Sequence, residues 1–176
     1  MQVSRKKLLA TGTALGAFGP LLLSPFIASA EAASESDVAV LNSAIMLELA
    51  GIKAYTAAAG LGILSPPILA VAKGFLQDHM AHRDALSGAV KAAGGTPTTV
   101  ATQLTYPPLK TETDILSFAE TVERAAASGY LGNIPKFQDR NLARLAASIL
   151  GVETTHVAIL DYTLKKNTEP YNDFVS

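Results

Sequence analysis

Residues 148–156 read SILGVETTH, and this stretch places Glu153 three residues before His156 on an apolar background. Residues three apart on a helix lie on neighbouring points of one face, so the pair presents two ligand groups to the same spot. A second motif of this kind, His79-x-x-His82, lies earlier in the chain. Each motif is followed four residues later by a leucine, as expected on the core-facing stripe of an amphipathic helix.

The polar residues of the two halves form an internal repeat. Glu48 is followed seven residues later by Tyr55, and Glu123 is followed at the same spacing by Tyr130. Each glutamate precedes the last histidine of a motif by nearly the same number of residues, and the chain's three histidines all fall within the two motifs. The repeat therefore predicts that four helices bring these side chains to one place.

Helix start and stop signals divide the chain into four long segments. A capping box, Ser34-x-x-Asp37, precedes the first segment, and two prolines after Ser65 begin the second. No segment shows the sustained alternation of a strand. The prediction is an all-α fold, an antiparallel four-helix bundle in which two helical hairpins are joined by a long crossover. The predicted helices span residues 38–59, 66–93, 113–130 and 138–165, and the crossover spans 95–111.

Composition limits the function classes that the chain can serve. Its 176 residues, 49% hydrophobic and 16% charged, suffice for one sizeable core and one domain. The absence of cysteine excludes disulfides and thiolate ligands, so any metal must be held by nitrogen and oxygen. A net charge of −1 provides no basic field for nucleic acid, and no phosphate loop or nucleophile motif is present. Catalytic residues therefore stay unassigned.

The first thirty residues are typical of a signal peptide. A basic start at residues 5–7 precedes an apolar run, and residues 28–30 read ASA, a cleavage site of the Ala-x-Ala type. The start resembles a twin-arginine signal in which Lys6 replaces the second arginine. We expect residues 1–30 to be removed and 31–176 to form an exported domain, periplasmic or extracellular and free of the membrane. The alternative is an uncleaved membrane anchor.

The two motifs and the two glutamates predict a metal centre in the bundle. One glutamate from each of two helices, together with a paired motif from each of the other two, completes a six-ligand box suited to two ions. Imidazole favours iron, zinc or copper over calcium and magnesium. The alternative is a buried polar network without metal. The predicted ligands are Glu48, His79, His82, Glu123, Glu153 and His156.

These residues and their surroundings resemble the ferritin-like superfamily, especially exported bacterial ferritin-like proteins related to plant desiccation-related proteins. The resemblance covers nearly all of residues 37–165, and it is strongest at 40–55, 118–130 and 148–156. It implies a carboxylate-bridged metal pair that handles oxygen or peroxide or oxidises ferrous iron. Ligands of that family match this sequence by position at Glu48, His82, Glu123, Glu153 and His156.

One position departs from the family pattern, because His79 stands where a glutamate is expected. With three glutamates and three histidines, two dications would leave a net charge of about +1 on the ligand set. Two further acids lie nearby. Glu120 is the better candidate for an extra ligand, since rubrerythrin-like proteins carry a third-helix carboxylate at this kind of spacing. Asp78, four residues before His82, could also face the site as an extra ligand or the partner of one, but we prefer to interpret it as part of a solvated helix face.

Tyr55 and Tyr130 lie two turns, about 10 Å, from the glutamates of their own helices, which argues against ligation beside them. We interpret both as core aromatics, with a hydrogen bond to a ligand or a radical relay as the alternative.

Three functional hypotheses follow. The first is a redox protein of the peroxidase or oxidase type, with two metal ions, iron first, and oxygen or peroxide as its small oxidant partner. The second is a metal-binding or structural stress protein without turnover, holding zinc, copper or manganese. The third is a metal-free scaffold. The sequence leaves open whether the protein is an enzyme and whether it forms a homo-oligomer.

Overall fold

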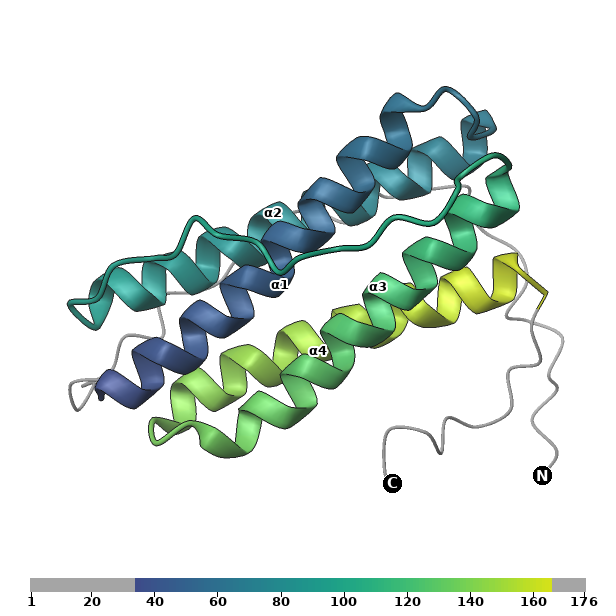
Figure 1. Cartoon of the computed structure of the whole chain (residues 1–176). Coiled ribbons are helices and arrows are strands. Elements are labelled where there is room, and N and C mark those ends of the chain that lie inside the picture. Colours follow the sequence, from purple (N-terminus) through teal and green to yellow (C-terminus); the bar gives the residue numbers. More distant parts are fainter. Residues whose placement is uncertain (1–33, 166–176) are drawn as a thin grey trace, which may run out of the picture.

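The computed structural model describes residues 34–165, which fold into a bundle of long helices (Figure 1). The bundle contains α1 (Glu35–Gly60), α2 (Pro66–Ala92), α3 (Glu112–Asn133) and α4 (Arg140–Thr163), with a 3-10 turn, η2 (Ile134–Lys136), between the last two. Within residues 34–165 no strand occurs, so the all-α prediction is confirmed. The predicted signal peptide at 1–30 lies outside the described residues.

The four helices pair as two antiparallel hairpins. The α1–α2 hairpin and the α3–α4 hairpin meet mainly where α1 packs on α3. The crossover between α2 and α3 runs along the length of the bundle, so that α3 starts at the end where α2 starts (Figure 1). It is anchored on α1, because Thr102 N donates to Met46 O over 2.9 Å and Thr98 N donates to Asn42 Oδ1 over 2.8 Å. The predicted topology is therefore observed.

The observed helix ends lie within three residues of the predicted ones: α1 begins three residues earlier than predicted, and α4 is two residues shorter at each end. The Ser34–Asp37 capping box is present at the start of α1. A second capping box, formed by Thr111 and Asp114, starts α3 one residue before the predicted position. The predicted end of α3 near residue 130 was wrong, since the helix continues through Gly132 to Asn133 and gives way to the proline-containing turn η2. A helix tolerates a glycine at a cost of about 1 kcal/mol, whereas proline removes a backbone donor.

Two apolar clusters occupy the two ends of the bundle. One contains Leu41, Ile45 and Leu86, and the other contains Phe75 and Leu160. On α1 and α2, the candidate ligands at positions 48, 79 and 82 lie between the residues of the two clusters along each helix. The polar side chains are therefore held near mid-length, with packed hydrocarbon on both sides.

Length and hydropathy alone do not separate these core helices from membrane spans. Two of the described helices, α1 and α4, are long and apolar enough to cross a membrane by that test. The helix core of a water-soluble bundle passes the same test, so the finding carries no assignment.

Asp37 links the start of α1 to the start of α4 and is 1% exposed. Its Oδ1 accepts from Gln138 N over 2.8 Å, and its Oδ2 accepts from Asp139 N over 3.3 Å and Ser34 N over 3.4 Å. Asp37→Ala leaves these backbone donors without their acceptor, and we expect it to lower the free energy of unfolding by about 2–3 kcal/mol in denaturant titrations.

The matched control is Asp114→Ala in the capping box of α3. Asp114 accepts only from the neighbouring Lys110 N and Thr111 N among the hydrogen bonds found in residues 34–165, and both contacts are exposed. We expect a loss of about 1 kcal/mol, as for an ordinary helix cap. Equal losses for the two variants would show that the link from α1 to α4 adds nothing.

Candidate metal centre

The six predicted ligands come together in the middle of the bundle. Glu48 lies on α1, Glu123 on α3, and the paired motifs lie on α2 and α4. Glu48, Glu123, Glu153 and His79 are 0% exposed, and His156 is 2% exposed. The side chain of His82 is 12% exposed and is the most accessible of the set. Because charged side chains are rarely buried without partners, this concentration requires mutual neutralisation or bound cations.

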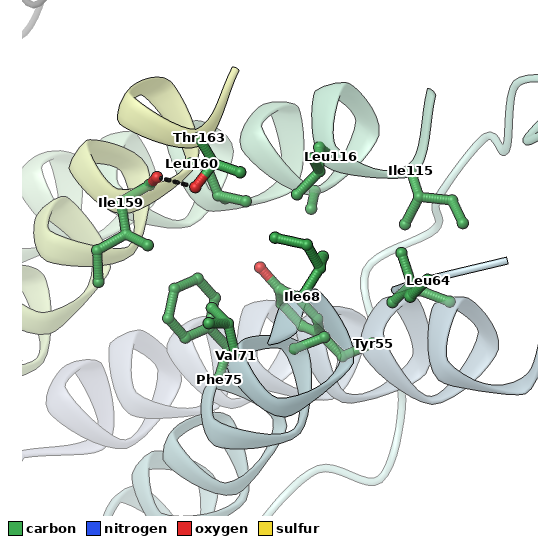
Figure 2. A pocket seen from close by; sticks show the side chains of 13 residues that line it. Tyr55, Leu64, Ile68, Val71, Phe75, Ile115, Leu116, Ile159, Leu160 and Thr163 are labelled. Atoms are coloured by element: carbon green, nitrogen blue, oxygen red, sulfur yellow. Dashed lines mark hydrogen bonds between the residues drawn. The ribbon is translucent and has the colours of Figure 1, made fainter. Parts of the chain in front are cut away.

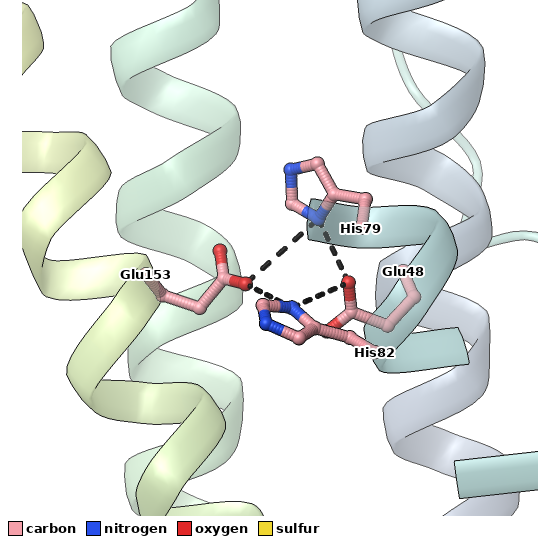
Figure 3. Close-up of side chains that lie close together, drawn as sticks. All are labelled: Glu48, His79, His82 and Glu153. Carbon is pink, nitrogen blue, oxygen red and sulfur yellow. Dashed lines mark hydrogen bonds and ion pairs between the residues drawn. The ribbon is translucent and has the colours of Figure 1, made fainter. Parts of the chain in front are cut away.

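One group of four candidate ligands is formed by α1, α2 and α4 (Figure 3). His79 Nδ1 lies 2.7 Å from Glu48 Oε2. His82 Nδ1 lies 3.1 Å from Glu153 Oε1 and 3.5 Å from Glu48 Oε2. One donor atom from each side chain lies within 4.8 Å of the others, so a single cation could contact all four.

A second group of four combines His79, Glu123, Glu153 and His156 and meets the same 4.8 Å limit. His156 Nδ1 lies 3.3 Å from Glu123 Oε2 and 4.0 Å from Glu153 Oε2. His79 Nε2 lies 3.2 Å from Glu123 Oε1. His79 and Glu153 belong to both groups, which are therefore adjacent positions of one centre and not separate sites.

The two tyrosines of the repeat bond reciprocally across the bundle. Tyr55 of α1 donates its hydroxyl proton to Glu123 of α3, and Tyr130 of α3 donates to Glu48 of α1. Burial, followed by the charge of the accepting carboxylate, raises the pKa of both tyrosines, so both remain donors at neutral pH. Both interpretations are observed together, because each ring is buried in an apolar cluster and each hydroxyl bonds a candidate ligand. Each carboxylate is oriented by the opposite half of the chain.

Carboxylates hold the three histidines in their charged form when no metal is bound. Burial lowers the pKa of each histidine, but hydrogen bonds and nearby charges outweigh it. The pKa of His82 rises to about 9 through Glu153 and Glu48, and the pKa of His156 rises to about 9 through Asp78 and Glu123. Protons on these rings thus balance the buried carboxylates, and a metal cation would replace them.

Glu153 is the least satisfied of the buried carboxylates. Burial raises its pKa to about 7, against the opposing effect of the nearby His82. Neither of its oxygens has a hydrogen bond of acceptable geometry within residues 34–165, and His82 Nδ1, although 3.1 Å from Oε1, is also left without one. Buried polar atoms that converge without hydrogen bonds are the donor set expected of a cation site. The residues present therefore fit a metal centre.

Asp78 contacts the centre although its side chain is 52% exposed. Its Oδ2 lies 3.2 Å from His156 Nε2. Of the two interpretations that the sequence left open for Asp78, this contact favours the one in which it faces the centre, although the side chain also stays half-exposed. A carboxylate on one ring nitrogen fixes the proton there and leaves the other nitrogen, here Nδ1, facing Glu123 and Glu153. This arrangement is typical of metal-bound histidine.

Glu120, proposed as an extra ligand, is 6% exposed and forms an ion pair with Arg124 Nε at 2.7 Å. Arg124 also donates to Asp161 Oδ2 over 3.0 Å. Glu120 belongs to neither group of candidate ligands found among residues 34–165. Arg124 follows Glu120 by four residues, a helical spacing at which opposite charges meet, and this signal was present in the sequence.

Two residues that the sequence analysis missed shape the histidine rings. The ring of Phe75 stacks on His156 with 3.8 Å between centroids. Gly51 lies so close to His79 that a Cβ there would come within 2.7 Å of the ring atoms Cε1 and Nε2. Gly51 follows Glu48 by three residues on the same helix face, which is the one sequence feature that could have suggested its position.

A small apolar pocket lies at the end of the bundle beside Tyr55 (Figure 2). Its volume is about 20 Å³, enough for about one water molecule. Side chains from all four helices line it, among them Ile68, Phe75, Leu116 and Leu160. This pocket therefore has room for a very small molecule and not for an organic substrate.

Comparison with known proteins agrees with the helical-bundle fold. The family model of the ferritin-like domain matches residues 36–166. A conserved hypothetical protein from Mycobacterium tuberculosis has a similar structure, with a TM-score of 0.67, 19% identity, and coverage of 78% of this chain and 94% of that one. A ferritin-like, diiron-carboxylate protein from Bacillus anthracis gives a TM-score of 0.63 and 21% identity, over 74% of this chain and 99% of that one. No curated protein matches in sequence. Since the family model covers most of the chain, the protein belongs to the ferritin-like domain family.

Proposed function

We propose that this protein binds two metal ions, iron first, at the Glu/His centre and uses them to consume oxygen or peroxide. The observation that supports this proposal is the convergence of six buried ligand groups, including the two oxygens of Glu153 that lack hydrogen bonds within residues 34–165. The diiron-carboxylate protein from Bacillus anthracis, which shares the fold, makes iron the first metal to test. The metal would supply the electron-transfer steps of such a reaction.

The residues around the centre orient the ligands and exclude water. Reciprocal hydroxyl bonds from Tyr55 and Tyr130 fix one oxygen of each accepting glutamate. Asp78 holds a proton on His156 Nε2, so that Nδ1 faces the ions. Three glutamates contribute three negative charges and reduce the charge of two dications to about +1. The small pocket beside Tyr55 favours a reactant of a few atoms.

The proposed reaction balances without a further reductant in a single turnover. A ferrous pair held by the glutamates and histidines of the two groups would supply two electrons, which with two protons reduce one hydrogen peroxide to two waters. Repeated turnover requires an external electron donor. The protons can enter from solvent, because Asp78 is half-exposed and contacts His156, which is buried.

A second candidate function, metal binding without turnover, is favoured by His79. This third imidazole replaces a negative charge of the expected ligand set and suits zinc or copper as well as iron. A stress protein that sequesters such ions would need no oxidant.

We also propose that the protein is exported, with residues 1–30 as its signal. The support is the sequence pattern of a basic start, an apolar run and an ASA site. N-terminal sequencing of the protein from its native cells should begin near residue 31.

Metal analysis followed by rapid mixing tests the function. We expect metal analysis to find about two iron ions per chain after anaerobic loading. One equivalent of peroxide should oxidise both ions within seconds, as measured by absorption and by Mössbauer spectroscopy. Bound iron that peroxide oxidises no faster than free iron would select metal binding without turnover. Failure to bind any of iron, manganese, zinc or copper would leave the metal-free scaffold.

A further inference from the structure

His79 lies at the boundary between the two ligand groups, and each of its nitrogens faces a different one. Nδ1 lies 2.7 Å from Glu48 Oε2 and 3.8 Å from Glu153 Oε1, within the first group. Nε2 lies 3.2 Å from Glu123 Oε1, within the second. A neutral imidazole has one lone pair and one N–H, so it can ligate an ion in only one of the groups.

The contacts of the ring decide which group receives the lone pair. Glu123 Oε1, the oxygen that faces Nε2, already accepts the hydroxyl of Tyr55 and is thus committed to hydrogen bonding. A proton on Nε2 can bond this oxygen and leaves the lone pair on Nδ1. A carboxylate acceptor on the distal nitrogen is the usual partner of a metal-bound histidine. His79 therefore belongs to the group of Glu48, His82 and Glu153.

Gly51 makes this placement sterically possible. A Cβ at position 51 would lie 2.7 Å from Nε2 and Cε1 and 2.8 Å from Cδ2 of His79, closer than carbon atoms normally approach. In the internal repeat, residue 51 corresponds to Ala126 and His79 corresponds to Glu153. In the first half, glycine at 51 is paired with the bulky ring of His79. In the second half, Ala126 is paired with the smaller side chain of Glu153. The two differences between the halves form a matched pair.

We propose that the Gly51–His79 pair divides the centre into a tight four-ligand position and a weak three-ligand position that fill in order. The tight position is formed by Glu48, His79, His82 and Glu153. The weak position keeps Glu123 Oε2, His156 and the second oxygen of Glu153. This inference rests on the proposed metal centre and adds unequal affinities to it. A carboxylate at 79 would instead offer one oxygen to each position.

Stepwise binding of zinc and cobalt to the metal-free full chain tests the division. We expect two binding steps whose dissociation constants differ by about 10-fold or more. Calorimetry measures the steps for zinc, and visible absorption measures them for cobalt. In His79→Glu the two steps should approach each other, because the second position gains a ligand. A parent protein that binds two ions in one step, unchanged by His79→Glu, would overturn the division while leaving the metal centre intact. Absence of any binding would instead overturn the proposed function.

Gly51→Ala tests the steric half of the pair. Displacement of the ring should weaken the first step by about 10–100-fold, the range found when the support of a ligand is disturbed. The matched control is Gly88→Ala on α2, where a Cβ would meet nothing within 4 Å and binding should not change. Adding Gly51→Ala to His79→Glu should cost less than about 3-fold, because alanine already accompanies glutamate in the other half.

If Gly51→Ala weakened the first binding step equally in the parent protein and in His79→Glu, the proposed pairing of residues 51 and 79 would be refuted. Circular dichroism and thermal unfolding of every variant show whether it folds. Should Gly51→Ala fail to fold, the change in the ratio of the two steps in His79→Glu still decides the proposal.

Discussion

Glu153→Gln is expected to make the metal-free protein more stable and to abolish tight metal binding. Glu153 is 0% exposed, and burial raises the pKa of its carboxyl to about 7. At pH 8 the native protein without metal must therefore hold this buried group ionised at a cost, and a neutral amide avoids that cost. We expect the free energy of unfolding to rise by about 2 kcal/mol.

Binding should change in the opposite direction. Glu153 belongs to both ligand groups, so its replacement removes an oxygen ligand from each position. We expect the affinity for the first zinc ion to fall by about 100-fold or more, because disturbing the support of a ligand already costs 10–100-fold. Denaturant unfolding of the metal-free chains and zinc calorimetry measure the two effects. Glu153 would then lower the stability of the metal-free protein in exchange for metal binding, a common trade-off between stability and function.

Glu120→Gln is the matched control. Glu120 is also a buried glutamate, but it forms an ion pair with Arg124 and belongs to neither ligand group. This variant should lose stability, since the charge of its partner is left partly buried, and should bind zinc as the parent does. If Glu153→Gln lowered stability and left binding unchanged, Glu153 would be an ordinary structural residue and the centre would lose its main support.

The second large effect is a fall in stability of the metal-free protein as the pH rises. The pKa of His82 and the pKa of His156 are each raised from 6.5 to about 9. A group with a raised pKa in the folded state stabilises that state fully below pH 6.5 and loses this contribution as the pH rises through about 9. Glu153, raised from 4.5 to about 7, lowers stability in the same direction over that lower range.

We therefore expect the metal-free protein to be most stable near pH 5–6 and to lose on the order of 5 kcal/mol by pH 9.5. Glu48 and Glu123 set the acid limit, because the hydrogen bonds of the histidines overcome burial and lower both pKa values. Guanidinium unfolding at a series of pH values measures the curve. The zinc-loaded protein is the internal control. Its advantage over the metal-free form should grow with pH, since zinc requires deprotonated rings.

A metal-free protein that gained stability between pH 6.5 and 9.5 would contradict this result. The rings would then be neutral in the native state, and the carboxylates would lack the cationic partners that the geometry gives them.

The helices and the ligand set were predictable because both depend on local spacing. Capping boxes and prolines mark the start of helices within a few residues, and the three-residue spacing of each motif fixes one helix face. The repeat then predicted that Glu48 and Glu123 would meet the histidines, and the structure places them together. The end of α3 was missed because glycine weakens a helix without stopping it.

The contacts between helices could not be predicted, since they depend on how each helix is rotated about its axis. Tyr55 lies two turns from Glu48, which excluded a contact on the same helix but did not reveal Glu123 as its partner. The contact of Asp78 with His156 requires the packing of α2 on α4. The approach of Gly51 to the ring of His79 likewise depends on the distance between α1 and α2.

The reciprocal tyrosine bonds make the orientation of each glutamate depend on contact between the two hairpins. Neither hairpin contains the hydroxyl that aligns its own glutamate, because Tyr55 serves α3 and Tyr130 serves α1. A chain cut within the crossover would thus yield two fragments with misaligned acids until they recombine. The two glutamates are therefore oriented only when the two hairpins dock, because each hydroxyl comes from the opposite half of the chain.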